Sequence, residues 1–430
     1  MFRVAGRSAS RRCAEAVVLM VSRGPDNRPI KDYRKFHRTI LSDPSDNFDR
    51  PIAVQEFLRR AVQEGVSELF FGDLRPVVAK IDWEFCAATN HLLTPQDLRG
   101  LRKFLFGDHT QPASPHRHWH KIGRVHLRDK EYLRYEVTET EIHDASELRG
   151  HEIVLRLLPN VLPDIEFYEL DRELRDHLPR SGLVLVSGGA DSDATGLIAA
   201  LVRWVVEDRS VEHRAVIYAL TDYSFTQELR PIAWEKSSIL QVETPPGEPL
   251  NRAMVQATAI GADVVAIGAC RDPATMEIAL ALAAEGKRVF VGVGTSGVMN
   301  TVARVLALLS RGRGEDHAPG LPELALNLRT IISQKMVRNQ QGSISALQEY
   351  LIVGPPLREA LLQTAPSGWP LPFLTYFEAE GESFAACASV ARNAGVISTE
   401  VFRRVVAETT APIITRRPAR AAGATQAKKS

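Results

Sequence analysis

Residues 183–195, LVLVSGGADSDAT, restrict the possible folds of this chain more than any other segment. An apolar run typical of a buried strand leads into a glycine-containing turn. The apolar helical segment GLIAALVRWV follows at residues 196–205. That order of elements points the free backbone N–H groups at the start of a helix toward a phosphate. The segment therefore predicts the frame of a nucleotide-binding loop inside an α/β sheet.

The residues within this frame are unsuited to a phosphate. The pattern GxxxxGK[ST] is met by Gly188 and Thr195, but Asp193 stands at the last glycine and Ala194 at the lysine. At about 4 Å, a carboxylate repels a phosphate charge by roughly 1 to 4 kcal/mol. A carboxylate at a helix N-terminus is itself stabilised by about 0.3 to 1 kcal/mol. We therefore expect the loop to satisfy its own donors. Its residues are Gly188, Gly189, Asp191, Ser192, Asp193 and Thr195.

Composition excludes several classes of protein. The 430 residues are 44% hydrophobic, enough for packed cores, and 53 basic residues balance 52 acidic ones. This balance predicts neither nucleic acid nor an anionic membrane surface as a partner. No apolar run reaches the roughly 18 residues that cross a bilayer. The four cysteines, Cys13, Cys86, Cys270 and Cys387, are scattered without CxxC spacing, which favours reduced thiols in the cytoplasm.

The two ends of the chain are predicted to lack packed structure. Residues 1–50 are polar and proline-containing, and we expect a flexible arm. Their opening, MFRVAGRSASRRC, is similar to a transit peptide, but a mobile arm, or a true start at Met20, is the preferred interpretation. Residues 411–430 are predicted to form a disordered basic tail.

Residues 51–160 are predicted to form a small α/β domain. Helical periodicity at 54–63 and 93–106 alternates with strand patterns at 67–71, 130–141 and 152–157. Thr94 and Pro95 are placed as the N-cap and first residue of the second helix. The segment 158–163, with two prolines, is predicted to be a linker.

Residues 161–360 are predicted to form a parallel sheet with crossover helices. The expected strands are 183–186, 215–218, 263–267 and 288–293, with a helix at 274–284 and a surface loop at 311–320. Helical patterns are also expected at 322–337 and 384–407, and residues 361–410 are expected to form a C-terminal helical region.

Seven motifs occur along the chain. Their shared order is a much more specific signal than a single glycine pattern. They are GVSEL at 65–69, LRY at 133–135, VLRLLP at 154–159, AIGACRDPAT at 266–275, GTSGVMNTVARV at 294–305, IISQKMV at 331–337 and LQEYLIV at 347–353. In this order the chain resembles the PilT-like traffic ATPases of type II/IV secretion and type IV pili, and among them the type IVB, or Dot/Icm-type, secretion ATPases. The resemblance implies an α/β protein with a PAS-like N-terminal domain, a RecA-like P-loop core with a parallel sheet, and C-terminal helices.

The chain departs from this family at the positions that perform its chemistry. Ala194 replaces the phosphate-binding lysine, Ala269 replaces the glutamate that polarises water, and Gly294 replaces the histidine of the histidine box. Ala219 and Tyr223 align where the family has acidic residues after the second core strand. Because phosphoryl transfer depends on positioning and charge stabilisation, no catalytic residue is assigned. ATP and magnesium are expected to bind only if the degenerate loop still holds them, and no metal site is expected.

Three arginines are candidates for acting on a neighbouring subunit. The resemblance implies that Arg134 and Arg156, on two strands, lean over a nucleotide at a subunit boundary, and Arg271 survives from the second Walker segment. Ordinary surface ion pairs are an equally good interpretation of the first two, and Glu136 replaces a further family arginine. The implied assembly is a homo- or hetero-hexamer that includes an active traffic-ATPase paralogue.

The role that the resemblance implies is a catalytically inactive structural or regulatory subunit of a type IVB secretion or conjugation motor. Such a subunit would be cytoplasmic, or peripheral at the inner membrane through inner-membrane components of the secretion system. No nucleic acid is expected as a partner.

Three other patterns allow different interpretations. SGGADS at 187–192 matches the loop of ATP pyrophosphatases, and a nucleotide sensor that binds without hydrolysis is a further alternative. GVGTSG at 292–297 is a lone GxGxxG, a weak dinucleotide signal. The cluster His109, His116, His118 and His120 contains alternate residues, which share one face of an extended segment and suggest zinc ligands, but a solvated loop is preferred.

Overall fold

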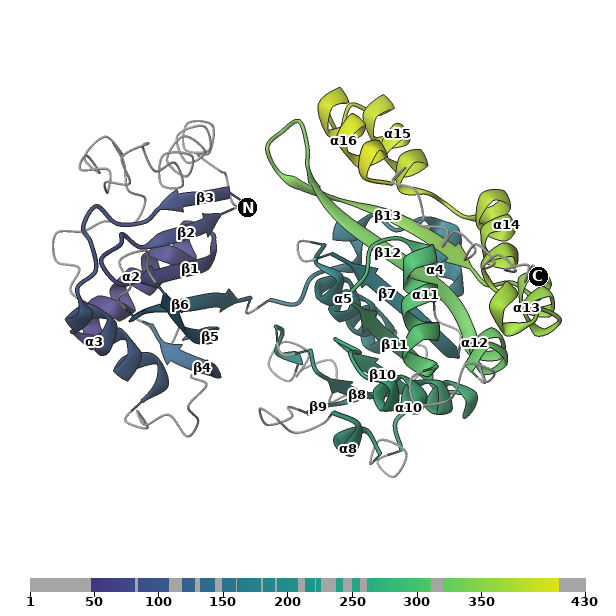
Figure 1. Ribbon diagram of the computed structural model, residues 1–430, viewed down its shortest axis with the longest axis horizontal. Coiled ribbons are helices and arrows are strands. Elements are labelled where there is room, and N and C mark those ends of the chain that lie inside the picture. Colours follow the sequence, from purple (N-terminus) through teal and green to yellow (C-terminus); the bar gives the residue numbers. More distant parts are fainter. Residues whose placement is uncertain are drawn as a thin grey trace, which may run out of the picture.

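The computed structural model consists of two sheet-containing domains joined by one connecting segment (Figure 1). It describes residues 48–81, 84–107, 118–127, 132–143, 149–159, 161–178, 181–189, 192–207, 213–220, 222–225, 237–242, 250–255, 261–310 and 320–409. The expected arm and tail, apart from residues 48–50, lie outside these ranges, as do residues 311–319 of the expected loop.

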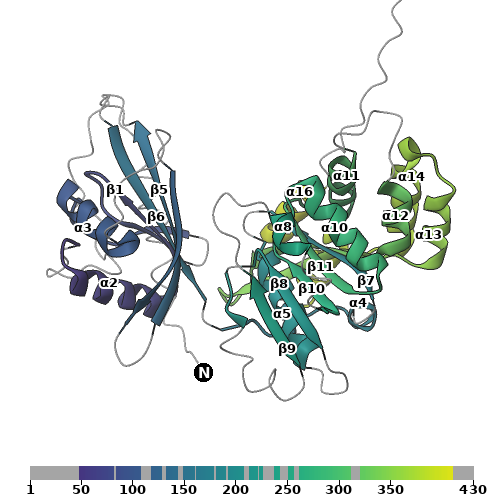
Figure 2. The same ribbon diagram turned by 90° about the horizontal axis from the view of Figure 1, so that it is seen from below.

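The N-terminal domain is an antiparallel sheet covered by helices on one face. Its elements are α2 (Pro51–Gln63), β1 (Val66–Gly72), β2 (Val78–Ile81), β3 (Glu84–Ala87), α3 (Pro95–Phe106), β4 (His118–His126), β5 (Tyr132–His143) and β6 (Arg149–Leu158). The strand order is β3-β2-β1-β6-β5-β4. Figure 2 shows α2 and α3 on the side of the sheet away from the core domain. The opposite face of the sheet is therefore directed at the core.

Local sequence explains why the helices of this domain begin where they do. Pro51 opens α2 and Pro95 opens α3, because the missing N–H of proline has no partner at the first helical turn anyway. The Thr94 hydroxyl accepts the Asp97 N–H while the Asp97 carboxylate accepts the Thr94 N–H, a complete capping box. The buried face of each helix packs on the sheet through residues such as Phe57 and Leu101.

The core domain contains a seven-stranded sheet, parallel except for one edge strand. Its strand order is β13-β12-β7-β11-β10-β8-β9. The strands are β7 (Gly182–Gly188), β8 (Arg214–Tyr218), β9 (Ser238–Val242), β10 (Val264–Ile267), β11 (Arg288–Val293), β12 (Leu328–Arg338) and β13 (Ile344–Ile352). β7 is buried along its whole length because helices cover both faces of the sheet.

Two groups of helices enclose this sheet. The connecting segment forms η2 (Ile165–Tyr168) and α4 (Arg172–His177), which pack with α5 (Ala194–Glu207) on one face. The other face is covered by α8 (Leu250–Met254), α10 (Pro273–Ala284), α11 (Val298–Leu309) and α12 (Gly320–Asn327). Since α5 follows β7 directly, the loop between them lies at the carboxyl edge of the sheet, where ligands of open α/β sheets bind.

The C-terminal helices pack against one end of the core. They are α13 (Pro355–Leu362), η3 (Pro366–Gly368), α14 (Pro370–Glu380), α15 (Phe384–Asn393) and α16 (Thr399–Thr409). Figure 1 shows α15 and α16 beside the β12–β13 hairpin, and Val337 and Leu347 of that hairpin join their apolar cluster. In the described part of the chain, no helix is both long and apolar enough to cross a membrane.

One of the two helical expectations from the sequence was wrong in part, and the other was confirmed. Only the first part of 322–337 is helical, because β12 begins at Leu328 and pairs with β7 in parallel. β12 is buried on both faces over most of its length, so it lacks the alternation that marks a half-exposed strand. The pattern at 384–407 covers two helices, since Gly395 takes a positive φ of 73° that ends the first.

Candidate functional site

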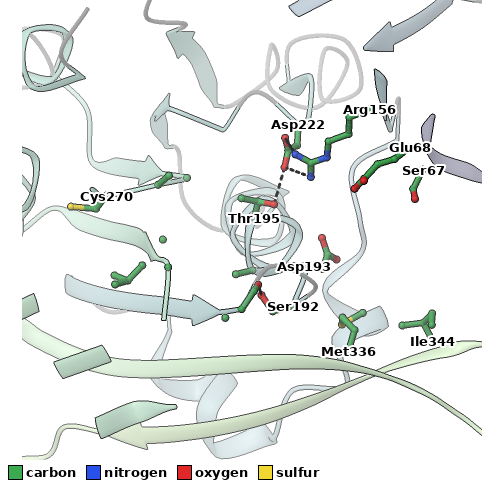
Figure 3. A pocket seen from close by; sticks show the side chains of 18 of the residues that line it. Ser67, Glu68, Arg156, Ser192, Asp193, Thr195, Asp222, Cys270, Met336 and Ile344 are labelled. Carbon is green, nitrogen blue, oxygen red and sulfur yellow. Dashed lines mark hydrogen bonds and ion pairs between the residues drawn. The ribbon is translucent and has the colours of Figure 1, made fainter. Parts of the chain in front are cut away.

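A cavity of about 740 Å³ lies between the N-terminal domain and the carboxyl edge of the core sheet (Figure 3). The N-terminal domain lines it with Gly65, Ser67, Glu68, Lys80 and Arg156. The core contributes the β7–α5 loop, the segments that follow β10 and β11, and Met336 and Ile344 from the hairpin. The cavity therefore occupies the position at which a P-loop fold holds its nucleotide.

The phosphate-loop segment is packed against itself. The Ser192 hydroxyl donates a hydrogen bond of 2.8 Å to the carbonyl oxygen of Gly189, and Ser192 is 4% exposed. A Cβ atom on Gly188 would overlap the Ser192 side chain, so glycine is required at the start of the loop. The Ser192 side chain thus lies directly against Gly188.

Asp193 adopts a left-handed backbone conformation with a φ of 53°. Its Oδ2 atom accepts a hydrogen bond of 2.8 Å from the Tyr168 hydroxyl, and its Oδ1 atom lies 3.5 Å from the Tyr223 hydroxyl. The Gly196 N–H, at the start of α5, also bonds this carboxylate. Burial raises the pKa of Asp193, and the bonds from Tyr168 and Gly196 partly oppose that shift. The side chain therefore caps the helix that would otherwise face a phosphate.

The side chain of Gln334, on β12, also holds this loop by hydrogen bonds. Its Nε2 atom donates to the carbonyl oxygens of Ser192 and Asp193, at 2.7 and 3.0 Å, and the residue is fully buried. Because β12 lies next to β7 in the sheet, this amide reaches the loop without crossing another strand. The loop conformation is therefore held by the core as well as by its own side chains.

Asp222, in the loop after β8, connects the core to the N-terminal domain. Its Oδ2 atom accepts a hydrogen bond of 2.9 Å from the Thr195 hydroxyl. The Arg156 guanidinium binds both carboxylate oxygens at 3.1 Å, and Arg134 donates to the Asp222 carbonyl oxygen at 3.2 Å. Figure 3 shows Arg156, Asp222 and Thr195 joined in this way above the loop.

The three residues predicted to replace catalytic residues of the family all line the cavity. Ala194 begins α5, Ala269 follows β10, and Gly294 follows β11. The acids that line the cavity are Glu68, Asp193 and Asp222.

Each of these acids is engaged by a partner on the same chain, and for Glu68 that partner is Lys80, whose Nζ atom lies 3.6 Å away. Among the residues that line the cavity, none is therefore a free carboxylate placed to activate water.

The remaining candidates fall in different places. Arg271 lines the cavity, whereas Asp272 accepts the Thr275 N–H at 2.9 Å and so caps α10. Asp191 lies outside the described residues. Arg134 and Arg156 contact the core of their own chain, and their action on a neighbouring subunit stays a prediction.

The histidine expectation is corrected in part. His118 and His120 belong to β4, because this segment pairs with β5 in register, so they do not form a loop. His109 and His116 lie outside the described residues. In the described part of the chain, no group of three or more histidine, cysteine or acidic residues is arranged to hold a metal ion.

Sequence analysis missed Asp222, Tyr168 and Gln334. The alignment placed Ala219 and Tyr223 at the family's acidic positions and passed over Asp222 between them. A polar residue just after a buried strand is the signal that identifies Asp222. Tyr168 and Gln334 lie 25 and 141 residues from Asp193, and no local pattern links them to it.

Strand order argues against the dinucleotide-binding alternative. In doubly wound sheets of order 3-2-1-4-5-6 or 2-1-3-4-5, the first two parallel strands are neighbours. Here β7 lies between β12 and β11, and two strands, β11 and β10, separate β7 from β8. A dinucleotide fingerprint follows the first strand of its unit, whereas GVGTSG spans the end of β11.

Fold and cavity together define a P-loop NTPase fold with a preceding antiparallel domain. A family model described as "Type II/IV secretion system protein" matches residues 145–363, half of the chain. The chain belongs to this family of secretion and pilus traffic ATPases, as the order of its motifs predicted.

Known proteins extend this comparison. The chain is 27% identical over 218 residues to a twitching motility protein of Neisseria gonorrhoeae, covering 50% of this chain and 55% of that protein. The X-ray structure of the ATPase DotB of Legionella pneumophila has a TM-score of 0.75 at 21% identity, over 86% of this chain and all of DotB. The pilus retraction motor PilT with bound ADP has a TM-score of 0.64 at 19% identity, over 82% of this chain and 96% of PilT.

These matches differ in what they cover. The chain spans between 55% and 65% of the length of the curated relatives that it matches. The two structural likenesses show a common fold, which confirms the α/β architecture with an N-terminal domain and a parallel-sheet core.

Proposed function

We propose that this chain is a pseudo-ATPase, a member of the family that neither hydrolyses nor productively binds ATP. The observation that carries the proposal is Asp193, which stands where the phosphate loop has its last glycine and is held by Tyr168. The neighbouring residue, Ala194, supplies no cation for a phosphate. A triphosphate at this loop would meet the Asp193 carboxylate in place of open N–H groups, and an alanine in place of the family's lysine.

Hydrolysis requires further groups that this cavity lacks. Phosphoryl transfer depends on a positioned nucleophile and on charges that stabilise the transferring group. Ala269 cannot orient or deprotonate water. Asp222 and Thr195, which together suit a magnesium ion in a P-loop site, are bound to each other, and Asp222 is also bound to Arg156. The lysine and the water-activating acid are therefore replaced, and Asp222 and Thr195 are already engaged.

The proposed role is that of a structural or regulatory subunit in the cytoplasmic motor of a type IVB secretion or conjugation system. The structural match covers the whole DotB chain, so the fold of that ATPase is retained here from end to end. This retained fold supports the proposed structural role. In this role the chain occupies a position in a homo- or hetero-hexamer, or docks on a ring of an active paralogue, and reaches the inner membrane through the secretion complex.

Phosphate release and co-purification test this function. Purified full-length protein, assayed by itself at low or high protein concentration, should release phosphate from ATP no faster than a protein-free control. Co-expression with an intact traffic ATPase from the same genome should yield a stable complex by size-exclusion chromatography. Turnover well above the control would contradict the proposal of inactivity, and failure to form any complex would contradict the proposed role.

A nucleotide sensor that binds without hydrolysis is the second candidate. The cavity volume of about 740 Å³ and the presence of Arg271 and Arg304 on its lining favour it. The sensor and the pseudo-ATPase proposed above differ in one measurable respect: only the sensor binds ATP.

A further inference from the structure

We propose that Arg156 and Asp222 form a latch that holds the N-terminal domain closed over the core without nucleotide or metal. The latch is the ion pair between β6 of the N-terminal domain and the loop after β8, together with its contacts to Thr195 and Arg134. It goes beyond the proposed function, because it concerns the relative position of the two domains and holds whether or not ATP binds.

The geometry of the pair is that of a strong guanidinium–carboxylate contact. Arg156 reaches both oxygens of Asp222 at 3.1 Å, an arrangement that fixes direction as well as distance. The Asp222 side chain is 13% exposed and the Arg156 side chain is 45% exposed. One partner is therefore largely shielded from water, which strengthens the pair relative to one on an open surface.

The N-terminal domain approaches Asp222 at a second point. Arg134 of β5 is 5% exposed and donates to the main-chain carbonyl of Asp222 at 3.2 Å. Arg134 and Arg156 come from paired strands, so one sheet presents both arginines to one residue of the core. Two contacts on a single residue resist rotation of the domain, which one ion pair alone would permit.

The latch brings a positive charge to the start of α5. The Thr195 hydroxyl and the Asp222 carboxylate are 2.9 Å apart at the start of α5, and a guanidinium supplies the positive charge beside them. Glu136, 3.5 Å from Arg156, and Glu68 add negative charge around the guanidinium. Arg156 thus satisfies Asp222 with a group that belongs to the protein.

Domains of one chain move relative to each other by default unless their interface restrains them. The connection between these domains includes residues 159 and 161–164, which form no helix or strand. We therefore expect that breaking the latch releases the N-terminal domain while leaving each domain folded.

Double electron–electron resonance between two spin labels measures this release directly. The labels are placed at Arg99→Cys on α3 and Ala281→Cys on α10, two exposed helical positions, one in each domain. Cys13 and Cys387 are replaced by serine in all variants, and Cys86 and Cys270 are retained because they are buried.

Arg156→Gln and Asp222→Asn should each raise the fraction of molecules at longer distances by about tenfold, as expected for loss of a charge-assisted pair. The double variant should match either single variant, because both remove the same interaction. The control is Arg175→Gln, which breaks an equally close pair with Glu166, at 2.6 and 3.0 Å, that does not join the two domains. Its distance distribution should match that of the unmutated protein.

Unchanged distributions in both latch variants, with circular dichroism showing that they are folded, would overturn the latch. So would an Arg175→Gln distribution that broadens to the same extent. The experiment contains no nucleotide, so its result is separable from failure of the proposed pseudo-ATPase function. ATP hydrolysis by a protein with an intact latch would contradict the pseudo-ATPase proposal alone. A protein that hydrolyses no ATP and has no latch would contradict the latch proposal alone.

Discussion

The Tyr168 hydroxyl donates a 2.8 Å hydrogen bond to the Oδ2 atom of Asp193, and so joins the connecting segment to the phosphate loop. Tyr168 is fully buried, and burial together with the nearby Asp193 charge raises the pKa of its phenol. The phenol therefore stays protonated and acts as a donor throughout the physiological pH range. In this loop the donors that face a phosphate in a P-loop instead bond the Asp193 side chain of the same protein.

Tyr168→Phe should lower the free energy of unfolding by about 1.5 to 3 kcal/mol, the range for a hydrogen bond to a charged group. The substitution keeps the ring in its apolar cluster and removes only the donor to a buried carboxylate. Urea denaturation followed by circular dichroism measures the change. Tyr376→Phe is the matched control, since its phenol makes no hydrogen bond in the described chain. Equal effects of the two substitutions would contradict a specific bond to Asp193.

Asp193→Asn should become more stable relative to the unmutated protein as the pH rises. Burial raises the pKa of Asp193 in the folded protein above its ordinary value of 3.8. The folded state therefore binds this proton more tightly, and the corresponding stability is lost as the pH rises from 3.8 through the folded pKa. Asparagine has no such loss.

Urea denaturation at intervals between about pH 4 and pH 8 checks this sign. Asp176→Asn, which removes an exposed acid of α4, is measured alongside it as the control. A difference between Asp193→Asn and the unmutated protein that falls with rising pH would contradict the assignment.

Gln334→Ala should free the phosphate loop without unfolding the core. It removes two hydrogen bonds to the carbonyl oxygens of Ser192 and Asp193, with an expected loss of about 2 kcal/mol. Hydrogen exchange measured by mass spectrometry should show faster exchange in peptides that cover 188–196. Gln340→Ala, which removes a 3.2 Å bond to Ile397 in the C-terminal region, should leave those peptides unchanged. Slow exchange in both variants would mean that Gln334 does not hold the loop.

The triple substitution Asp193→Gly, Ala194→Lys and Ala269→Glu should increase nucleotide binding relative to the native chain. It removes the capping carboxylate, supplies a cation for the β- and γ-phosphates, and restores an acid after β10. Fluorescent ATP analogues and an anisotropy titration detect the gain. Ala194→Lys alone should bind more weakly, because Asp193 would remain beside the new lysine. No gain in the triple variant would mean that other features of the cavity exclude ATP.

Much of the architecture was predictable because the signals are local. The strands β7, β8, β10 and β11 are short apolar runs bounded by turns, and each lies within a few residues of its expected position. Thr94 was correctly placed as an N-cap, since capping depends on residues three positions apart. β12 was mistaken for helix because a strand buried on both faces has no alternating pattern.

The candidate site was predictable only in its sequence-local part. The replacements at 193 and 194 were read directly from the loop pattern, whereas the partners of Asp193 come from η2 and the loop after β8. Asp222 was missed for a related reason, since its role depends on Arg156, 66 residues earlier in the chain. Such pairings arise when the tertiary fold brings distant strands together.

Isothermal titration calorimetry with ATP and magnesium tests the central claim most directly, because it requires neither turnover nor a partner subunit. The account predicts no heat of binding beyond dilution for the purified full-length chain, up to millimolar ATP. A saturable heat with micromolar affinity would contradict it, and would show that the loop holds a nucleotide despite Asp193 and Ala194.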